Sequence, residues 1–216
     1  MEARAPEAVR ADVRAALEIA RPAAVKIGMV ARGAVADAIA EGLAGYTGPV
    51  VYDPVLGASH GGALFAGGDA GKDLMQLLAR ATLVTPNRAE ATLLGGPAPG
   101  GAGASPADDD AWTAAVGAAL VVRGARAVLV KGGHGPSKTE ARDWLFTRAG
   151  TEVSAQLFVA PRLAGASPRG TGCALATAIA IRLGYGEDLP RAIAGGKAWL
   201  HSAIANARTI GDERRL

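Results

Sequence analysis

Helical segments and short apolar strands alternate along most of this 216-residue chain. Apolar residues at helical spacing predict a first helix over 6–20, and the apolar run 24–29 follows it as a candidate strand. Further strands are expected at 49–52, 82–85 and 127–130, with helices at 35–43, 72–79, 90–94 and from about 108 to 122. This alternation is typical of an α/β domain with a mainly parallel sheet. We therefore predict a three-layer α/β/α fold.

The remaining segments complete one predicted domain over residues 1–216. Two antiparallel strands are expected at 144–146 and 153–159, with a turn at Gly150. Two helices follow, over 171 to about 183 and 189 to about 207. The glycine- and proline-rich stretch 95–107 is predicted to be a mobile loop, and the charged tail 213–216 a solvated end.

Composition excludes several classes of protein. Half of the residues are hydrophobic, which provides a core and argues against intrinsic disorder. The net charge is only +3, basic residues are scattered and aromatics make up 4%, so we expect no nucleic-acid partner. No apolar run reaches the roughly 18 residues that span a bilayer, and the acidic start does not resemble a signal peptide. A single cysteine suits a reducing compartment, so a cytoplasmic location is predicted.

A glycine-rich turn, Gly170-Thr171-Gly172-Cys173, leads directly into an alanine-rich helix. Small residues allow successive backbone N–H groups to converge, and the helix dipole adds positive charge there, so the turn could hold phosphate oxygens. The same position is expected to lower the pKa of the Cys173 thiol and make it available as a base. The alternative is a tight turn capped by Thr171, with Cys173 as a small core residue.

Other polar residues fall just beyond predicted strands, at the edge where open α/β sheets bind ligands. Asn87 and Glu90, three residues apart at a helix start, suit Mg²⁺, although they also fit a capping box. Asp53 could orient Mg²⁺ or a substrate hydroxyl, or simply begin a turn with Pro54. Lys131 could neutralise phosphate charge, or be a solvated residue at a strand end.

Two further residue types complete the candidates. Lys26 interrupts an apolar strand and therefore needs an anionic partner. The three histidines have no metal-ligand spacing, and His134 is the one expected to approach a nucleotide.

Together these motifs resemble the hydroxymethylpyrimidine/phosphomethylpyrimidine kinases of thiamine biosynthesis, in the ribokinase-like superfamily. The resemblance covers nearly the whole chain and rests on five segments in order: Val25-Lys26-Ile27-Gly28-Met29, Asp53-Pro54-Val55, Thr85-Pro86-Asn87-x-x-Glu90, Val130-Lys131-Gly132-Gly133-His134 and Gly170-Thr171-Gly172-Cys173. It begins after the family's usual first strand and glycine-rich loop, so the expected fold is an N-terminally shortened ribokinase-like domain.

The resemblance implies ATP and Mg²⁺ as cofactors, a small-molecule acceptor and the following roles. Cys173 would act as the base on the hydroxymethyl group, in an anion hole formed with Gly170, Thr171 and Gly172. Asn87, Glu90 and Asp53 would organise Mg²⁺. Nucleotide-binding residues would be Lys131, Gly133, His134 and Asn87, and substrate-binding residues Met29, Lys26 and Asp53.

Three expectations remain open beside this interpretation. Phosphorylation of pyridoxal or pyridoxine is an alternative activity, since some relatives with a cysteine at this position accept that ring. A non-catalytic nucleotide-binding remnant is an alternative of another class. The segment 25–29 is expected to form an unpaired apolar edge, which predicts a homodimer or a partner chain that covers the edge.

Overall fold

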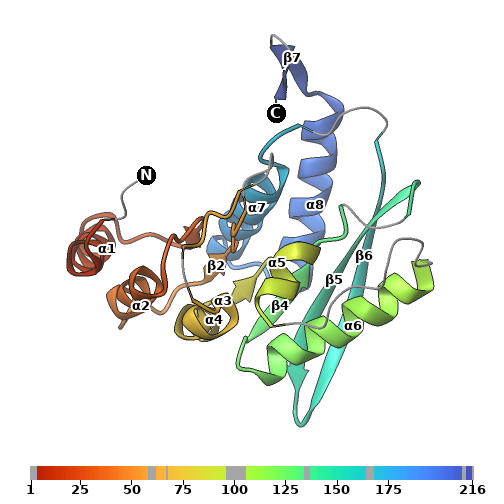
Figure 1. Cartoon of the computed structure of the whole chain (residues 1–216). Helices are drawn as coiled ribbons and strands as arrows, with labels where there is room; N and C mark the ends of the chain where they lie inside the picture. The colour runs from red at the N-terminus through yellow and green to blue at the C-terminus, as the bar shows by residue number, and fades with distance from the viewer. Residues whose placement is uncertain are drawn as a thin grey trace.

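A six-stranded sheet lies at the centre of the computed structural model, in the order β1-β2-β3-β4-β5-β6 (Figure 1). The structure describes residues 4–57, 62–66, 68–95, 106–133, 137–163, 168–210 and 213–215. The strands of this sheet are β1 (Val25–Ile27), β2 (Val50–Tyr52), β3 (Leu83–Val84), β4 (Ala127–Val130), β5 (Glu140–Ala149) and β6 (Glu152–Pro161). The helices are α1 (Pro6–Ala20), α2 (Gly33–Gly42), α3 (Ala70–Asp73), α4 (Met75–Arg80), α5 (Arg88–Leu93), α6 (Pro106–Val122), α7 (Thr171–Gly184) and α8 (Leu189–Ala205).

The first four strands are parallel and follow one another in chain order. Val25 lies opposite Val50, Val51 opposite Leu83, and Val84 opposite Val128. The hairpin of β5 and β6 then continues the sheet with antiparallel pairing. Because β1 is the first strand in this order, its outer side has no neighbouring strand among the described residues.

Alternate side chains of the strands enter two separate cores, one on each face of the sheet. Tyr52, Val84 and Val128 pack with helices α2, α4 and α6 on one face. Val51, Leu83 and Leu129 pack with α7 and α8 on the other. Since successive side chains of a strand point to opposite faces, this division confirms the predicted three-layer α/β/α arrangement with a mainly parallel sheet.

Helix α1 lies outside these layers and packs on α2 rather than on the sheet (Figure 1). It begins with Pro6, whose fixed φ and missing N–H suit the first turn. None of its residues is fully buried, and Val13 is the side chain that approaches Gly42 of α2. Helix α1 is therefore a peripheral element held mainly through α2.

The structure differs from the sequence-based expectation in three places. The helix expected at 72–79 is two helices, because Leu74 leaves helical geometry between α3 and α4. The predicted strands at 144–146 and 153–159 belong to two longer ten-residue strands. At the charged tail, β8 (Glu213–Arg215) pairs antiparallel with β7 (Arg208–Ile210), a hairpin that the sequence did not predict. Backbone pairing needs no apolar side chains, so the charged tail carried no sign of it.

Two other expectations, the mobile loop and the absence of a membrane span, can be compared only with the described residues. Residues 96–105 of the predicted loop 95–107 lie outside the described residues, whereas Pro106 already begins α6. In the portion that is described, no helix combines the length and apolar character needed to cross a membrane.

Candidate active site

The carboxyl ends of the parallel strands meet at one edge of the sheet. Hydrogen bonds extend the ladder beyond the strands: Asp53 donates its N–H to the Ile27 carbonyl (2.9 Å), and Lys131 donates its N–H to the Pro86 carbonyl (2.9 Å). Asn87 and Lys131 are thereby paired as neighbouring residues of a parallel bridge. Three residues predicted to share this edge, Asp53, Asn87 and Lys131, are brought together.

An ion cluster forms around the ammonium of Lys131. Its Nζ lies 2.6 Å from Asp53 Oδ1 and 3.9 Å from Glu90 Oε2. Thr85 donates its hydroxyl to the same Asp53 oxygen (3.1 Å). Asp53 is 1% exposed, and its other oxygen, Oδ2, has no hydrogen-bond partner among the described residues. Lys131 is thus a largely shielded counter-ion, with a side chain 12% exposed, rather than a solvated residue, and Asp53 is more than a turn-forming residue.

Asn87 and Glu90 form a capping box at the start of α5. The Asn87 side chain accepts the N–H of Glu90 (2.9 Å), and Glu90 Oε2 accepts the N–H of Asn87 (2.6 Å). Burial raises the pKa of the Glu90 carboxyl, Lys131 and the Asn87 amide oppose that rise, and Asp53 adds to it. The capping box, which was the alternative to a Mg²⁺ site, is therefore present. It also places the Glu90 carboxylate near the Lys131 ammonium.

The N-terminus of α7 carries no side-chain cap. Gly170 is the N-cap residue, with φ 78°, a left-handed conformation that glycine adopts without strain. Thr171 is the first helical residue and does not cap, so the first-turn amides are available to an anion. A β-carbon on Gly172 would lie 3.0 Å from Lys131 Nζ, which shows how closely the helix start approaches the ion cluster.

Cys173 is half-buried in the first turn of α7. Burial raises the pKa of its thiol, and Asp53 raises it further, whereas Lys26 and Lys131 act in the opposite direction. The predicted lowering of this pKa is wrong, because burial and the neighbouring carboxylate outweigh the two ammonium groups. The same interactions bring Cys173, Asp53, Lys26 and Lys131 into one site.

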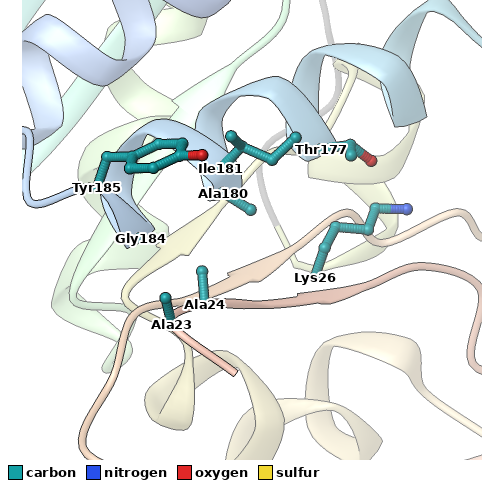
Figure 2. A pocket seen from close by; sticks show the side chains of 8 residues that line it. All are labelled: Ala23, Ala24, Lys26, Thr177, Ala180, Ile181, Gly184 and Tyr185. Atoms are coloured by element: carbon teal, nitrogen blue, oxygen red, sulfur yellow. The ribbon is translucent and has the colours of Figure 1, made fainter. Parts of the chain in front are cut away.

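A pocket of about 430 Å³ follows the seam between β1 and α7 (Figure 2). Lys26 reaches from β1 toward α7, where Thr177 lies one turn beyond Cys173. No ion pair involves Lys26 among the described residues, so the anionic partner expected for it is not found there. The lining is otherwise mostly apolar: Ala23, Ala24, Ala180, Ile181, Gly184 and Tyr185. The pocket lies beside the ion cluster and does not include it.

The other predicted site residues are not part of the ion cluster or the pocket lining as described. Met29 is 43% exposed just after β1 and does not line the pocket. Gly133 is exposed after β4, and His134 lies outside the described residues. No group of three or more metal-ligating His, Cys, Asp or Glu side chains occurs within the described ranges.

Three residues in or next to the site were missed by sequence reasoning. Thr85 donates its hydroxyl to Asp53; it stands at a strand end and in the motif Thr85-Pro86-Asn87-x-x-Glu90, but no role was expected for its side chain. Asp143 on β5 accepts the N–H of Gly132 (2.8 Å) and also binds Lys197 of α8. Nothing in the sequence pattern pairs Asp143 with Lys197, because the two lie 54 residues apart.

Comparison with known proteins identifies the family. The model of the phosphomethylpyrimidine kinase family matches residues 1–215. This chain belongs to that family. The hydroxymethylpyrimidine/phosphomethylpyrimidine kinase of Rhizobium meliloti is 42% identical over 184 residues, which cover 85% of this chain and 65% of the relative. The enzyme of the same name from Streptomyces coelicolor is 35% identical over 206 residues, covering 95% and 71%. Membership of the predicted kinase family is thus confirmed.

Solved structures confirm the ribokinase-like fold of this phosphomethylpyrimidine kinase family member. The pyridoxal kinase of Staphylococcus aureus, in complex with AMP-PCP and pyridoxal, superposes with a TM-score of 0.77 at 23% identity, covering 95% of this chain and 70% of that one. The phosphomethylpyrimidine kinase of Clostridium difficile has a TM-score of 0.66 at 25% identity, covering 94% and 78%. This chain therefore spans about two thirds to three quarters of the length of such relatives.

Proposed function

We propose that this chain transfers the γ-phosphate of ATP to hydroxymethylpyrimidine, or to its monophosphate, as a step of thiamine biosynthesis. The observation that carries the proposal is the meeting of Cys173, at the uncapped start of α7, with Asp53 and Lys131. The names of the relatives support it, since both enzymes described above are kinases for these pyrimidines.

The phosphate would bind at the N-terminus of α7. The amides of Thr171, Gly172 and Cys173, following the left-handed Gly170, would donate to its oxygens, and Lys131 would balance its charge. Phosphoryl transfer depends mainly on positioning and charge neutralisation, which is what this arrangement of donors and one ammonium supplies.

The acceptor would lie between Cys173 and the end of β1. Its hydroxyl oxygen would form the new bond to the γ-phosphorus, the bond to the β–γ bridging oxygen would break, and ADP would leave. The hydroxyl proton would pass to the Cys173 thiolate. Because the pKa of Cys173 is raised, the thiolate is scarce at neutral pH, so turnover should increase toward alkaline pH. Lys26 and Met29 would contact the pyrimidine.

Mg²⁺ fits the residues at this edge. Asp53 Oδ2 is a buried carboxylate oxygen without a hydrogen-bond partner among the described residues, and Glu90 Oε2 lies 3.9 Å from the Lys131 ammonium that binds Asp53. Mg²⁺ is commonly held by one or two carboxylates, water and substrate phosphates. Asp53 and Glu90 would hold the ion, with Asn87 beside them, and the ion would neutralise phosphate charge. Gly133 and His134 are proposed to lie near the nucleotide.

Pyridoxal or pyridoxine phosphorylation is the second candidate. The pyridoxal kinase of Lactobacillus plantarum is 28% identical with a TM-score of 0.69 and covers 95% of this chain. The open seam between β1 and α7 gives little steric basis for choosing between the two rings. A non-catalytic nucleotide-binding remnant stays as the third candidate.

One assay separates the three candidates. The chain is incubated with ATP, Mg²⁺ and one acceptor at a time: hydroxymethylpyrimidine, its monophosphate or pyridoxal, and ADP formation is measured. We expect the two pyrimidines to be turned over at least tenfold faster than pyridoxal. Preference for pyridoxal would favour the second candidate. ATP binding without turnover of any acceptor would identify the remnant.

A homodimer is proposed from the free edge of β1. Its backbone groups have no neighbouring strand among the described residues, and such edges are normally paired or covered. Light scattering at micromolar concentration should give the mass of two chains, and a monomer would contradict the proposal. The cytoplasmic location stays a proposal consistent with the single cysteine.

A further inference from the structure

A buried ion pair links α8 to the central sheet behind the proposed phosphate site. Lys197 Nζ binds Asp143 Oδ2, and the two residues are only 9% and 5% exposed. Burying two charges carries a desolvation cost that their attraction often fails to repay. A hydrophobic pair would hold α8 against the sheet as well, so packing alone does not account for this pair.

The second oxygen of Asp143 reaches the loop after β4. Asp143 Oδ1 accepts the N–H of Gly132 at 2.8 Å. The loop lies against β5 so closely that a β-carbon on Gly132 would come within 1.8 Å of the Arg142 carbonyl oxygen. Only glycine permits this approach, and the approach is what allows Asp143 to bind the backbone.

Lys131 is consequently held by hydrogen bonds on both sides of its α-carbon. Its own N–H is bound to the Pro86 carbonyl, and the next N–H, that of Gly132, is bound to Asp143. Fixing both peptide units fixes the direction in which the Lys131 side chain leaves the backbone. In that direction, Nζ reaches the carboxylates of Asp53 and Glu90. It also lies close to Gly172 at the start of α7.

We propose that Lys197 and Asp143 are positioning residues, which orient the Lys131–Gly132 peptide so that Lys131 faces the phosphate site. Lys197 binds one oxygen of Asp143 and so holds its carboxyl group in one orientation, and the other oxygen holds the N–H of Gly132. Neither side chain needs to touch the substrate. This inference rests on the proposed function of the same site.

Two matched double variants test the proposal. Lys197→Met/Asp143→Asn is uncharged but keeps an oxygen that accepts the Gly132 N–H. Lys197→Met/Asp143→Leu is also uncharged and similar in size, but removes that acceptor. Both avoid the unpaired buried charge that a single substitution would leave. The binding of ATP with Mg²⁺ is measured by calorimetry, with kcat and KM for ATP measured alongside and thermal unfolding as the check on folding.

The expected result is a difference between the two variants. The Leu variant should bind ATP about tenfold more weakly than the Asn variant, with a higher KM for ATP, although both unfold cooperatively. Equal affinities would overturn the positioning role and leave a purely structural pair. If the Leu variant does not fold, Lys197→Met/Asp143→Ala removes the same acceptor without added bulk.

A readout independent of the reaction separates this inference from the proposed function. If the unaltered chain binds no ATP, the proposed function fails, and hydrogen exchange of the Gly132 amide then tests the positioning contact. Exchange should be at least tenfold faster in the Leu variant than in the Asn variant. Equal exchange rates would overturn the inference.

Discussion

Lys131 and Lys26 belong to the same site but have opposite surroundings. Lys131 is bound by Asp53, lies near Glu90 and follows a backbone fixed on both sides. Lys26 lies on the edge strand β1 and has no ion pair among the described residues. The proposed phosphate side is therefore organised by the protein's own groups, whereas the proposed acceptor side has a lysine without an ion pair among the described residues. Four variants test this contrast.

Replacing Cys173 by Ala should have the largest effect. Loss of the proton acceptor should lower kcat by about 10²- to 10⁴-fold, while ATP affinity changes little because the α7 amides remain. Turnover and calorimetric ATP binding are the two measurements. Cys173→Ser keeps a poorer proton acceptor, so its kcat should lie between that of the unaltered chain and that of the Ala variant. Unchanged turnover in the Ala variant would exclude Cys173 as the base.

Replacing Lys131 by Met should destabilise the fold most. Asp53 would lose its only cation within 4 Å among the described residues, and removing one partner of a buried pair costs about 3–5 kcal/mol. We expect the free energy of unfolding to fall by about 3 kcal/mol in denaturant titration. Lys72→Met, at an exposed position, is the matched control and should change it by less than about 0.5 kcal/mol. An equal loss of unfolding free energy in the two variants would show that the Lys131–Asp53 pair does not stabilise the fold.

Replacing Asp53 by Asn should make the Cys173 thiol more reactive. Asp53 raises the pKa of Cys173, so removal of its negative charge lowers that pKa and increases the thiolate fraction at a given pH. The rate of alkylation by iodoacetamide, measured from pH 7 to 10, should shift to lower pH. Asp37→Asn, at a residue that does not influence this pKa, is the control. A shift to higher pH would contradict the site geometry.

Replacing Lys26 by Met should have the smallest effect on folding. No ion pair is lost among the described residues, so the free energy of unfolding should change by less than about 0.5 kcal/mol. The KM for the pyrimidine should rise several-fold if Lys26 contacts the acceptor, while the KM for ATP stays constant. A loss of stability similar to that of Lys131→Met would remove the distinction between the two sides.

Sequence reasoning succeeded where local patterns carry the information. Helix α1 was predicted with its observed bounds, because Pro6 fits a first turn and apolar residues follow at helical spacing. Strand β4 was also predicted with its observed bounds, since Ala127–Val130 is a short apolar run before polar residues. The edge of the sheet that gathers Asp53, Asn87 and Lys131 followed from the parallel topology.

Reasoning failed where distant residues decide the outcome. The pKa of Cys173 was predicted from its helix position alone, but the burial and the Asp53 carboxylate that raise it come from the folded arrangement. The Lys197–Asp143 pair joins a helix and a strand that no local pattern connects. Each is a tertiary effect, absent from composition and periodicity.

The order of the strands has a consequence for synthesis on the ribosome. Strands β1 to β4 are added to the sheet in chain order, and α2, α4 and α6 cover one face as they emerge. The face that carries Val51, Leu83 and Leu129 is covered by α7 and α8, which come only after residue 170. A nascent chain therefore exposes an apolar sheet face until α7 and α8 are made, and this is the stage at which it is most open to aggregation or chaperone binding. The helix that shields this face is also the one that brings Cys173, so protection of the core and completion of the site coincide in time.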